Sequence, residues 1–298
     1  MSIRVTPLPE AERRPRHVAI GTFDGVHLGH QAVIDHADTV LTFDPHPLNV
    51  LKPEAAPRLI APFAVRRDVL DGLGVEELVV VPFDDEFSNL GPEEFIERVL
   101  IERLGARKVS VGENFHFGAK ALGSPQMLAE RPEFETRIVP LIEIDGDTVS
   151  SSRIRELVES GDVAAARRCL GAPFMVEGEV VAGEQRGREL GFPTANIVPD
   201  ERLVTPGFGV YAAFADGVPA AVNVGVRPTF ESELGVLIET HLIDRDEDLY
   251  GRTLRVAFVE KMREEERFDD VGALIEQMRR DVEDARLICA SFTSGGSR

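Results

Sequence analysis

Cysteine is scarce in this chain of 298 residues, and its scarcity excludes two kinds of stabilising framework. The sequence contains two cysteines, Cys169 and Cys289, and each falls within a stretch whose apolar spacing predicts a helix. Two isolated cysteines supply neither a disulfide framework nor a set of zinc ligands. We therefore expect no disulfide framework, no zinc site and no functional role for either thiol.

Long apolar runs are also missing. No stretch approaches the roughly 20 apolar residues that cross a bilayer as a helix. The first 16 residues combine prolines with mixed charges and contain no apolar core of an export signal. Hydrophobic residues make up 43% of the chain and charged residues 29%, which is typical of a folded soluble protein. We expect a cytoplasmic protein with no membrane partner.

Positive charge is in short supply. Lysine and arginine total 33 against 52 acidic residues, so the formal net charge is −19. A strongly acidic surface repels nucleic acids and anionic membranes, and we expect neither as a partner. A phosphate-bearing ligand must then be held locally, by particular residues.

Apolar periodicity divides the chain into two domains, which we place at residues 1–170 and 171–298. In the first, strand and helix patterns alternate, which indicates a Rossmann-like α/β domain with a parallel sheet. The second has short strands separated by Gly, Pro and Asp, which is typical of a small β-barrel, here with a C-terminal helix. The expected strands are 17–21, 39–43, 77–82, 107–111, 136–142, 174–182, 210–215, 218–225, 236–243 and 253–260. The expected helices are 28–37, 62–73, 92–104, 151–169 and 271–290.

The first predicted strand runs into a glycine-rich turn that carries two histidines. Such a turn presents backbone N–H groups and the positive end of the next helix to an anion. His27 and His30 are three residues apart at the start of that helix, so their rings share one face. Gly29 leaves room for a nucleotide to approach the backbone. The turn, with Gly21 and Phe23, predicts a phosphate site; the alternative is a simple joint with two surface histidines.

Three further polar loops follow elements of the same half. The loop Thr42–Pro47 contains two prolines, which we expect to exclude a helix; its polar side chains either bind a ligand or merely cap the turn. The loop at 111–118 presents an amide between aromatic residues. The helix that begins near 151 opens with hydroxyls and guanidiniums, which suit phosphates or simply cap the helix. The candidate residues in these loops are Asp44, His46, Asn114, Ser152, Arg153 and Arg155.

The order of these four loops resembles the nucleotidyltransferase domain of the bifunctional riboflavin kinase/FMN adenylyltransferase family, also called FAD synthetases. The resemblance continues through the second half. Gly178 to Ile197, with Gly191-Phe-Pro-Thr-Ala-Asn196 at its core, resembles the riboflavin kinase signature. Asn223 to Phe230, Glu239 to His241 and Asp248 to Gly251 follow in the family's order. The resemblance covers nearly the whole chain.

The signature segment contains a candidate magnesium site. Thr194 and Asn196 are two residues apart, so an extended backbone places both oxygen-bearing side chains on one face. Gly183 and Gly187 would supply a flap over phosphates. Without the resemblance, this segment reads as an ordinary turn.

Glu239 lies in an alternating strand, so it shares a face with His241 and is opposed to Ile238 and Thr240. A strand carboxylate that points into a ligand site can accept a proton from an attacking hydroxyl. The alternative is a solvated glutamate on a half-exposed strand.

The resemblance implies two reactions, with ATP as co-substrate and Mg²⁺ as the metal in both. In the C-terminal domain, Glu239 would act as base while riboflavin takes the γ-phosphate of ATP to give FMN. In the N-terminal domain, FMN would attack the α-phosphate of a second ATP to give FAD and pyrophosphate. The resemblance implies that Asn114 and the 44–47 loop orient the nucleotide or flavin. The residues expected to neutralise charge there are His27, His30, Ser152, Arg153 and Arg155.

The chain departs from the family's usual pattern in two places. The segment from Gly29 to Thr39 is shorter, and His116 stands where many relatives carry arginine. Both departures concern adenylylation, so a riboflavin kinase with an impaired adenylyltransferase domain stays an alternative. The others are a non-catalytic flavin- or nucleotide-binding protein and, from the first half alone, a transferase for another small alcohol or phosphate. The sequence leaves the oligomeric state open.

Overall fold

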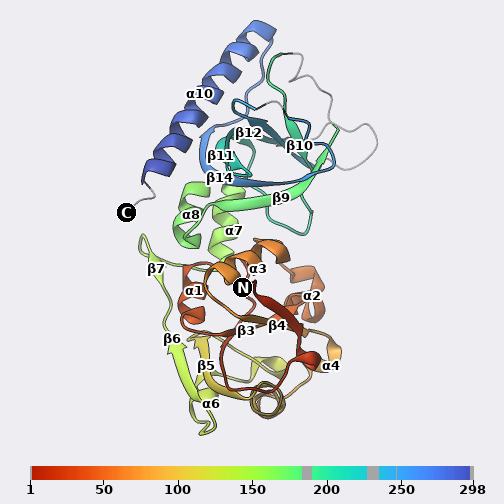
Figure 1. Cartoon of the computed structure of the whole chain (residues 1–298), viewed down its shortest axis with the longest axis vertical. Coiled ribbons are helices and arrows are strands. Elements are labelled where there is room, and N and C mark those ends of the chain that lie inside the picture. Colours follow the sequence, from red (N-terminus) through yellow and green to blue (C-terminus); the bar gives the residue numbers. More distant parts are fainter. Residues whose placement is uncertain (1, 183–189, 227–234, 246, 296–298) are drawn as a thin grey trace. The chain divides into compact units, whose positions relative to one another are not determined.

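The computed structural model describes residues 2–182, 190–226, 235–245 and 247–295 (Figure 1). They belong to two compact units, Met1–Ser151 and Ser152–Arg298. The two candidate flap residues, Gly183 and Gly187, lie outside the described residues. The predicted functional boundary after residue 170 concerns activity and stays a prediction.

The first unit is built on a six-stranded sheet in the order β1-β4-β3-β2-β5-β6, in which every neighbouring pair is parallel. Its strands are β1 (Arg4–Pro7), β2 (Arg16–Ile20), β3 (Thr39–Asp44), β4 (Glu77–Pro82), β5 (Ala106–Gly112) and β6 (Glu135–Val139). The strand order reverses at β2, which lies between β3 and β5. Ligands bind at the carboxyl ends of strands beside such a switch point. The predicted parallel α/β fold is confirmed.

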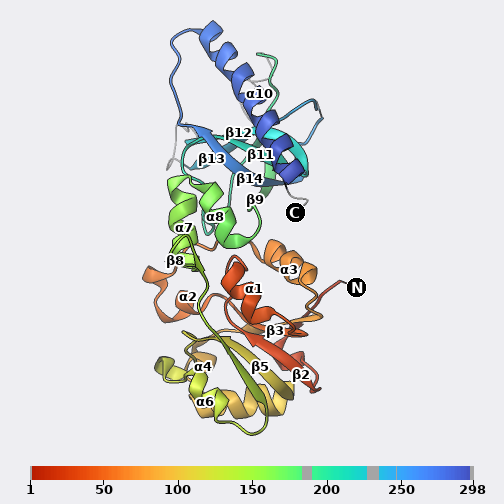
Figure 2. The ribbon, with the colours of Figure 1, turned by 90° about the vertical axis from the view of Figure 1, so that its left-hand side faces the viewer.

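Helices cover both faces of this sheet because alternate strand residues point to opposite sides. One core cluster joins Ala19, Val40 and Leu78 to α1 and α3, which Figure 2 shows together on one side of β2 and β3. The other core cluster lies on the opposite face of the sheet and joins Ile20 of β2 and Leu41 of β3 to η3 and α6. The helices are η1 (Leu8–Glu10), α1 (Leu28–Ile34), α2 (Pro47–Leu51), η2 (Pro53–Ala55), α3 (Phe63–Gly72), α4 (Asp85–Ser88), α5 (Pro92–Glu94), the π-helical η3 (Phe95–Leu104), η4 (Ala119–Ala121) and α6 (Pro125–Ala129).

Local details of this unit differ from the sequence expectations in several places. The expectation that prolines exclude a helix near residue 47 is wrong, because Pro47 occupies the first turn of α2, where its missing N–H costs nothing. The first crossover helix ends at Ile34, since His36 adopts a left-handed backbone with φ of 64°. The edge strand β1 and the hairpin of β7 (Glu143–Ile144) and β8 (Asp147–Thr148) were not predicted.

The second unit contains a closed antiparallel barrel in the order β10-β13-β12-β11-β14-β9. The strands are β9 (Phe174–Val181), β10 (Ala195–Ile197), β11 (Gly209–Ala215), β12 (Val218–Val226), β13 (Val236–Leu242) and β14 (Thr253–Arg263). Helix α10 (Val271–Gly295) packs against β11, β12 and β14 (Figures 1 and 2), with Ala285 and Cys289 buried beside Ala212. The predicted barrel with a C-terminal helix is confirmed.

The helix predicted at 151–169 is two helices, α7 (Ser151–Ser160) and α8 (Val163–Leu170). The break falls at Gly161, whose φ is 88°. A Cβ there would lie 2.8 Å from the Tyr211 hydroxyl of β11, so the position requires glycine. Cys169 and Cys289 are free and buried in α8 and α10.

Candidate functional sites

The histidine turn lies at the carboxyl end of β2. Its backbone is tightly wound, with positive φ at Phe23, Gly25 and Val26. His27 is the N-cap of α1, and its Nδ1 accepts a hydrogen bond of 3.2 Å from the backbone N–H of His30. A neutral His27 ring therefore carries its proton on Nε2, as a donor.

The two histidine rings lie on one face, as their spacing predicted, and in the structure they are stacked. Their centroids are 3.5 Å apart and their planes differ by 17°. The Phe23 ring meets His30 edge-on at 5.3 Å. Burial, with contributions from His27 and Arg66, holds the pKa of His30 well below its ordinary value. His30 is therefore neutral at pH 7 in this structure, and its buried Nδ1 has no hydrogen-bond partner within the described residues.

The glycines of the turn make room for these rings. A Cβ at Gly21 would lie 3.1 Å from the Phe23 ring. One at Gly29 would lie 3.2 Å from the His27 ring. The sequence argument assigned the space at Gly29 to a nucleotide, whereas in the structure the His27 imidazole lies there.

Two neighbouring strands bring further predicted residues to the same edge of the sheet. His46 follows β3 and caps α2, its Nδ1 accepting from the Leu48 N–H at 3.2 Å. Asp44 ends β3 and is exposed. Asn114 follows β5, also exposed, and Phe115 beside it stacks on Phe117 at 5.6 Å. Because β3 and β5 flank β2, these residues lie at the same edge of the sheet as the histidine turn.

The start of α7 reaches the turn through Ser151, whose hydroxyl donates to the Asp24 carbonyl at 3.1 Å. The predicted clamp residues Ser152, Arg153 and Arg155 come directly after it, in the second unit. Their part in the histidine site stays a prediction.

The sequence analysis missed Arg66. This arginine of α3 is 7% exposed, and its Nη1 donates to the Thr22 carbonyl at 3.1 Å. The helical periodicity of 62–73 assigned it no role, since nothing local shows that α3 returns beneath the turn.

The second site lies on the barrel, where Glu239 is flanked by two asparagines. Strand register pairs Glu239 with Asn196 of β10 on one side and with Asn223 of β12 on the other. Residues directly opposite each other point to the same face. Asn223 Nδ2 donates to Glu239 Oε2 at 3.3 Å. Ile238 and Thr240 are buried on the opposite face, as the alternation predicted.

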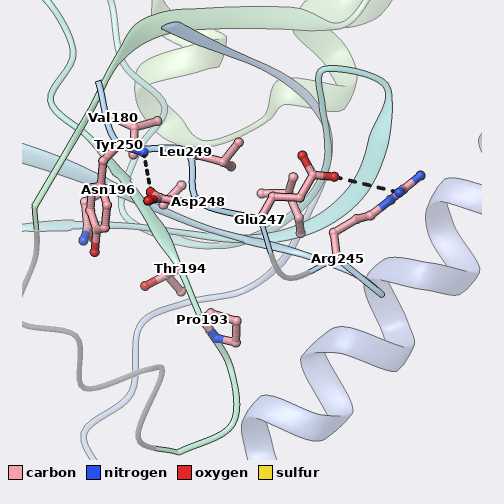
Figure 3. A pocket seen from close by; sticks show the side chains of 11 residues that line it. Val180, Pro193, Thr194, Asn196, Arg245, Glu247, Asp248, Leu249 and Tyr250 are labelled. Atoms are coloured by element: carbon pink, nitrogen blue, oxygen red, sulfur yellow. Dashed lines mark hydrogen bonds and ion pairs between the residues drawn. The ribbon is translucent and has the colours of Figure 1, made fainter. Parts of the chain in front are cut away.

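A pocket beside this row is lined by both predicted metal ligands, Thr194 and Asn196 (Figure 3). Asn196 is 6% exposed, and its Oδ1 is buried without a hydrogen-bond partner in the part of the chain that the structure describes. A buried carbonyl oxygen without a partner is costly unless a ligand satisfies it. Hydroxyl and carbonyl oxygens are ligands that Mg²⁺ accepts, so the two residues fit the predicted metal.

His241 forms a hydrogen bond with the loop just before Thr194 and Asn196. Its Nδ1 lies 2.9 Å from the Pro193 carbonyl, so Nδ1 carries the proton and donates. The Phe192 ring packs against the imidazole at 5.6 Å. Asp248 also lines the pocket, where its carboxylate accepts from the Tyr250 N–H at 3.2 Å (Figure 3). The sequence analysis assigned no role to His241 or Asp248.

The two sites define the class of protein. A histidine turn at the carboxyl ends of parallel strands is suited to binding anions. A barrel carboxylate beside neutral oxygen ligands is suited to accepting a proton during phosphoryl transfer. Such a pair of sites is typical of a nucleotide-dependent transferase with two catalytic units.

Comparison with known proteins identifies the family. The FAD synthetase family model matches residues 10–153, and the riboflavin kinase model matches residues 170–289. The bifunctional riboflavin kinase/FMN adenylyltransferase of Pseudomonas fluorescens is 36% identical, covering 93% of this chain and 95% of its own. That of Bacillus subtilis is 33% identical, covering 93% and 94%. The chain belongs to the bifunctional riboflavin kinase/FMN adenylyltransferase family, and both activities have their domain here.

A solved structure described as a macrolide-efflux protein from Streptococcus pneumoniae also matches. It has a TM-score of 0.86 at 31% identity and covers 95% of this chain and 99% of its own. Within the described residues of this chain, no helix has the length and apolar character to cross a membrane.

Proposed function

We propose that the barrel phosphorylates the 5′-hydroxyl of riboflavin with Glu239 as base, and that the histidine turn binds ATP for the adenylylation of FMN to FAD. The observation that carries the proposal is the row Asn196, Glu239 and Asn223 on one barrel face, with the Asn196 Oδ1 buried and unsatisfied. Such a row places a proton acceptor, the Glu239 carboxylate, beside a buried oxygen, Asn196 Oδ1, that is available to coordinate a metal ion.

In the kinase reaction, Glu239 takes the proton of the ribityl hydroxyl as that oxygen bonds to the γ-phosphorus. The bond from that phosphorus to the bridging oxygen breaks, and ADP leaves. The hydrogen bond from Asn223 Nδ2 orients the carboxylate. Thr194 and Asn196 would hold Mg²⁺, which neutralises charge on the phosphates when bound.

In the adenylylation, a phosphate oxygen of FMN bonds to the α-phosphorus of ATP, and pyrophosphate leaves. Both reactants are anionic, so the site must offset their repulsion. His27 donates from Nε2, and His30 contributes as a neutral ring. We keep the predictions that Ser152, Arg153 and Arg155 neutralise charge in this reaction and that the functional boundary follows residue 170, both of which rest on the sequence.

The loops after β3 and β5 orient the substrates. The exposed amide of Asn114 offers hydrogen bonds to a flavin or a base, and the partly exposed ring of Phe115, which stacks on the buried Phe117, offers an apolar face. Asp44 and His46 border the opposite side of the turn.

Product analysis tests the proposal. Purified protein is incubated with ATP, Mg²⁺ and either riboflavin or FMN, and flavins are separated by chromatography. We expect FAD in both samples. E239Q lowers FMN formation by about 10²-fold or more and leaves FAD formation from FMN intact, whereas H30A does the reverse. The matched controls are E260Q, an exposed glutamate of β14, and H36N, which suits the left-handed backbone there.

Each alternative has its own product pattern. FMN without FAD identifies a kinase with an impaired adenylyltransferase domain. No product in either sample identifies a binding protein without turnover. Loss of both activities in a single variant contradicts the assignment of two separate sites.

A further inference from the structure

One buried cation of the first unit is unexplained by the roles given so far. Arg66 extends from α3 to the end of β2, where its Nη1 donates to the Thr22 carbonyl at 3.1 Å. The residue is 7% exposed, and its Nε is buried without a hydrogen-bond partner within the described residues. Guanidinium N–H groups are rarely left buried and unpaired, because their desolvation is uncompensated.

The surroundings of Arg66 belong to several elements of the histidine site. Thr22 and Asp24 lie in the turn after β2, and Asp44 ends β3. Burial lowers the pKa of Arg66, and the charges of Asp24 and Asp44 oppose that shift. The Phe63 ring lies 5.6 Å from the guanidinium carbon.

The buried carboxylate of Asp24 also stabilises the turn. It is 1% exposed, and its Oδ1 accepts from the Ile60 N–H at 2.9 Å, which ties the turn to the segment leading into α3. Arg66 and Asp24 thus join the same two parts of the chain from opposite directions. A cation buried beneath an anion-binding turn acts through a low-dielectric medium, where its field is stronger than at the surface.

We infer that Arg66 is a positioning residue for adenylylation: it holds the histidine turn through the Thr22 carbonyl and places positive charge beneath the phosphates of ATP. The inference rests on the proposed role of His30. The charged and titratable groups that face His30 and Arg66 are His27 on α1, Asp24 in the turn and Asp44 at the end of β3. Arg66 is one of the causes that keep His30 neutral.

The test compares R66M and R66K with R67Q. Arg67 is the adjacent arginine of α3, and its side chain is 42% exposed and hydrogen-bonds Asp68, so R67Q is a matched control. Adenylylation of supplied FMN and phosphorylation of riboflavin are measured on the same preparations. We expect R66M to lower kcat/KM for adenylylation about tenfold or more. Phosphorylation and the R67Q variant stay unchanged.

The pH profile separates positioning from a general structural defect. His30 gains a proton as pH falls through its lowered pKa, so loss of the neighbouring cation moves protonation to higher pH. In R66M the acid limb of kcat/KM for adenylylation then shifts upward by about half a pH unit or more. R66K retains the charge, so its acid limb stays at the wild-type pH while kcat/KM falls, because the bond to Thr22 is altered.

Two results overturn the inference: R66M with wild-type kcat/KM and acid limb, or an equal loss in R67Q. If R66M does not fold, the R66K variant provides the test. A wild-type kcat/KM for adenylylation in R66K contradicts a positioning role for Arg66. If H30A leaves adenylylation unchanged, the proposed role of His30 has failed, and the kcat/KM of R66M still tests Arg66.

Discussion

Replacing Asn196 by leucine separates function from stability in the barrel unit. Asn196 is 6% exposed and its Oδ1 has no hydrogen-bond partner within the described residues. A buried unsatisfied oxygen costs about 1–3 kcal/mol. Leucine has nearly the same shape and no polar atoms, so N196L removes that cost and adds apolar burial.

The expected gain in unfolding free energy without ligand is about 1–2 kcal/mol, after allowance for imperfect packing of the branched side chain. For a unit of this size, each kcal/mol corresponds to about 2–4 °C in the unfolding midpoint. The ligand-free midpoint of N196L therefore rises by about 2–8 °C. Kinase activity falls below one hundredth of wild type, because the oxygen that fits Mg²⁺ is gone.

The assay is calorimetric unfolding with and without Mg²⁺ and ADP, beside the riboflavin phosphorylation rate. Wild-type protein is stabilised by the ligands, and N196L is not. N49L, which changes an exposed asparagine of α2, is the control and alters neither quantity. A lower ligand-free midpoint in N196L, or turnover near the wild-type rate, refutes the reasoning.

Two further predictions concern the loop and the buried ion pair. H241F removes the donor to the Pro193 carbonyl, so the Mg²⁺ concentration for half-maximal kinase rate rises about fivefold or more, whereas H241N, with an amide donor, retains most of the wild-type value. In the first unit, burial raises the pKa of Glu77, but hydrogen bonds from Arg16 and Thr6 outweigh it, so the folded pKa lies below the ordinary value. Stability from Glu77 is therefore present above the unfolded pKa of about 4.3 and is lost as pH falls through the folded pKa. E77Q leaves the buried Arg16 without its paired anion, lowers the unfolding free energy by about 3 kcal/mol at pH 7 and flattens the acid dependence in denaturant titrations; an unchanged midpoint contradicts this account.

Most of the architecture could be predicted from the apolar periodicity of the sequence. Alternation along β13 identified which residues face the core, because a strand's side chains alternate whatever it pairs with. The two-domain organisation and the barrel with its final helix followed from the same local patterns. The break of the predicted helix at Gly161 could not be predicted from these patterns. The position requires glycine because the Tyr211 hydroxyl lies close to it, and Tyr211 belongs to a strand far away in the sequence.

The local motifs also determined much of the sites. The spacing of His27 and His30 was enough to predict rings on one face, and Thr194 and Asn196 line one pocket as their spacing implied. These relations span two or three residues, so backbone geometry alone decides them.

Tertiary structure decided which other groups join. Barrel register brings Asn223 and Asn196 to either side of Glu239 across strands far apart in sequence. The return of α3 beneath the turn brings Arg66 to Thr22 and to the surroundings of His30. Neither contact has a local signature, because strand pairing and helix packing arise from burial of apolar faces along the whole chain. The sequence by itself therefore determined the chemistry available to each site, and the packed fold decided which charges and hydrogen bonds tune it.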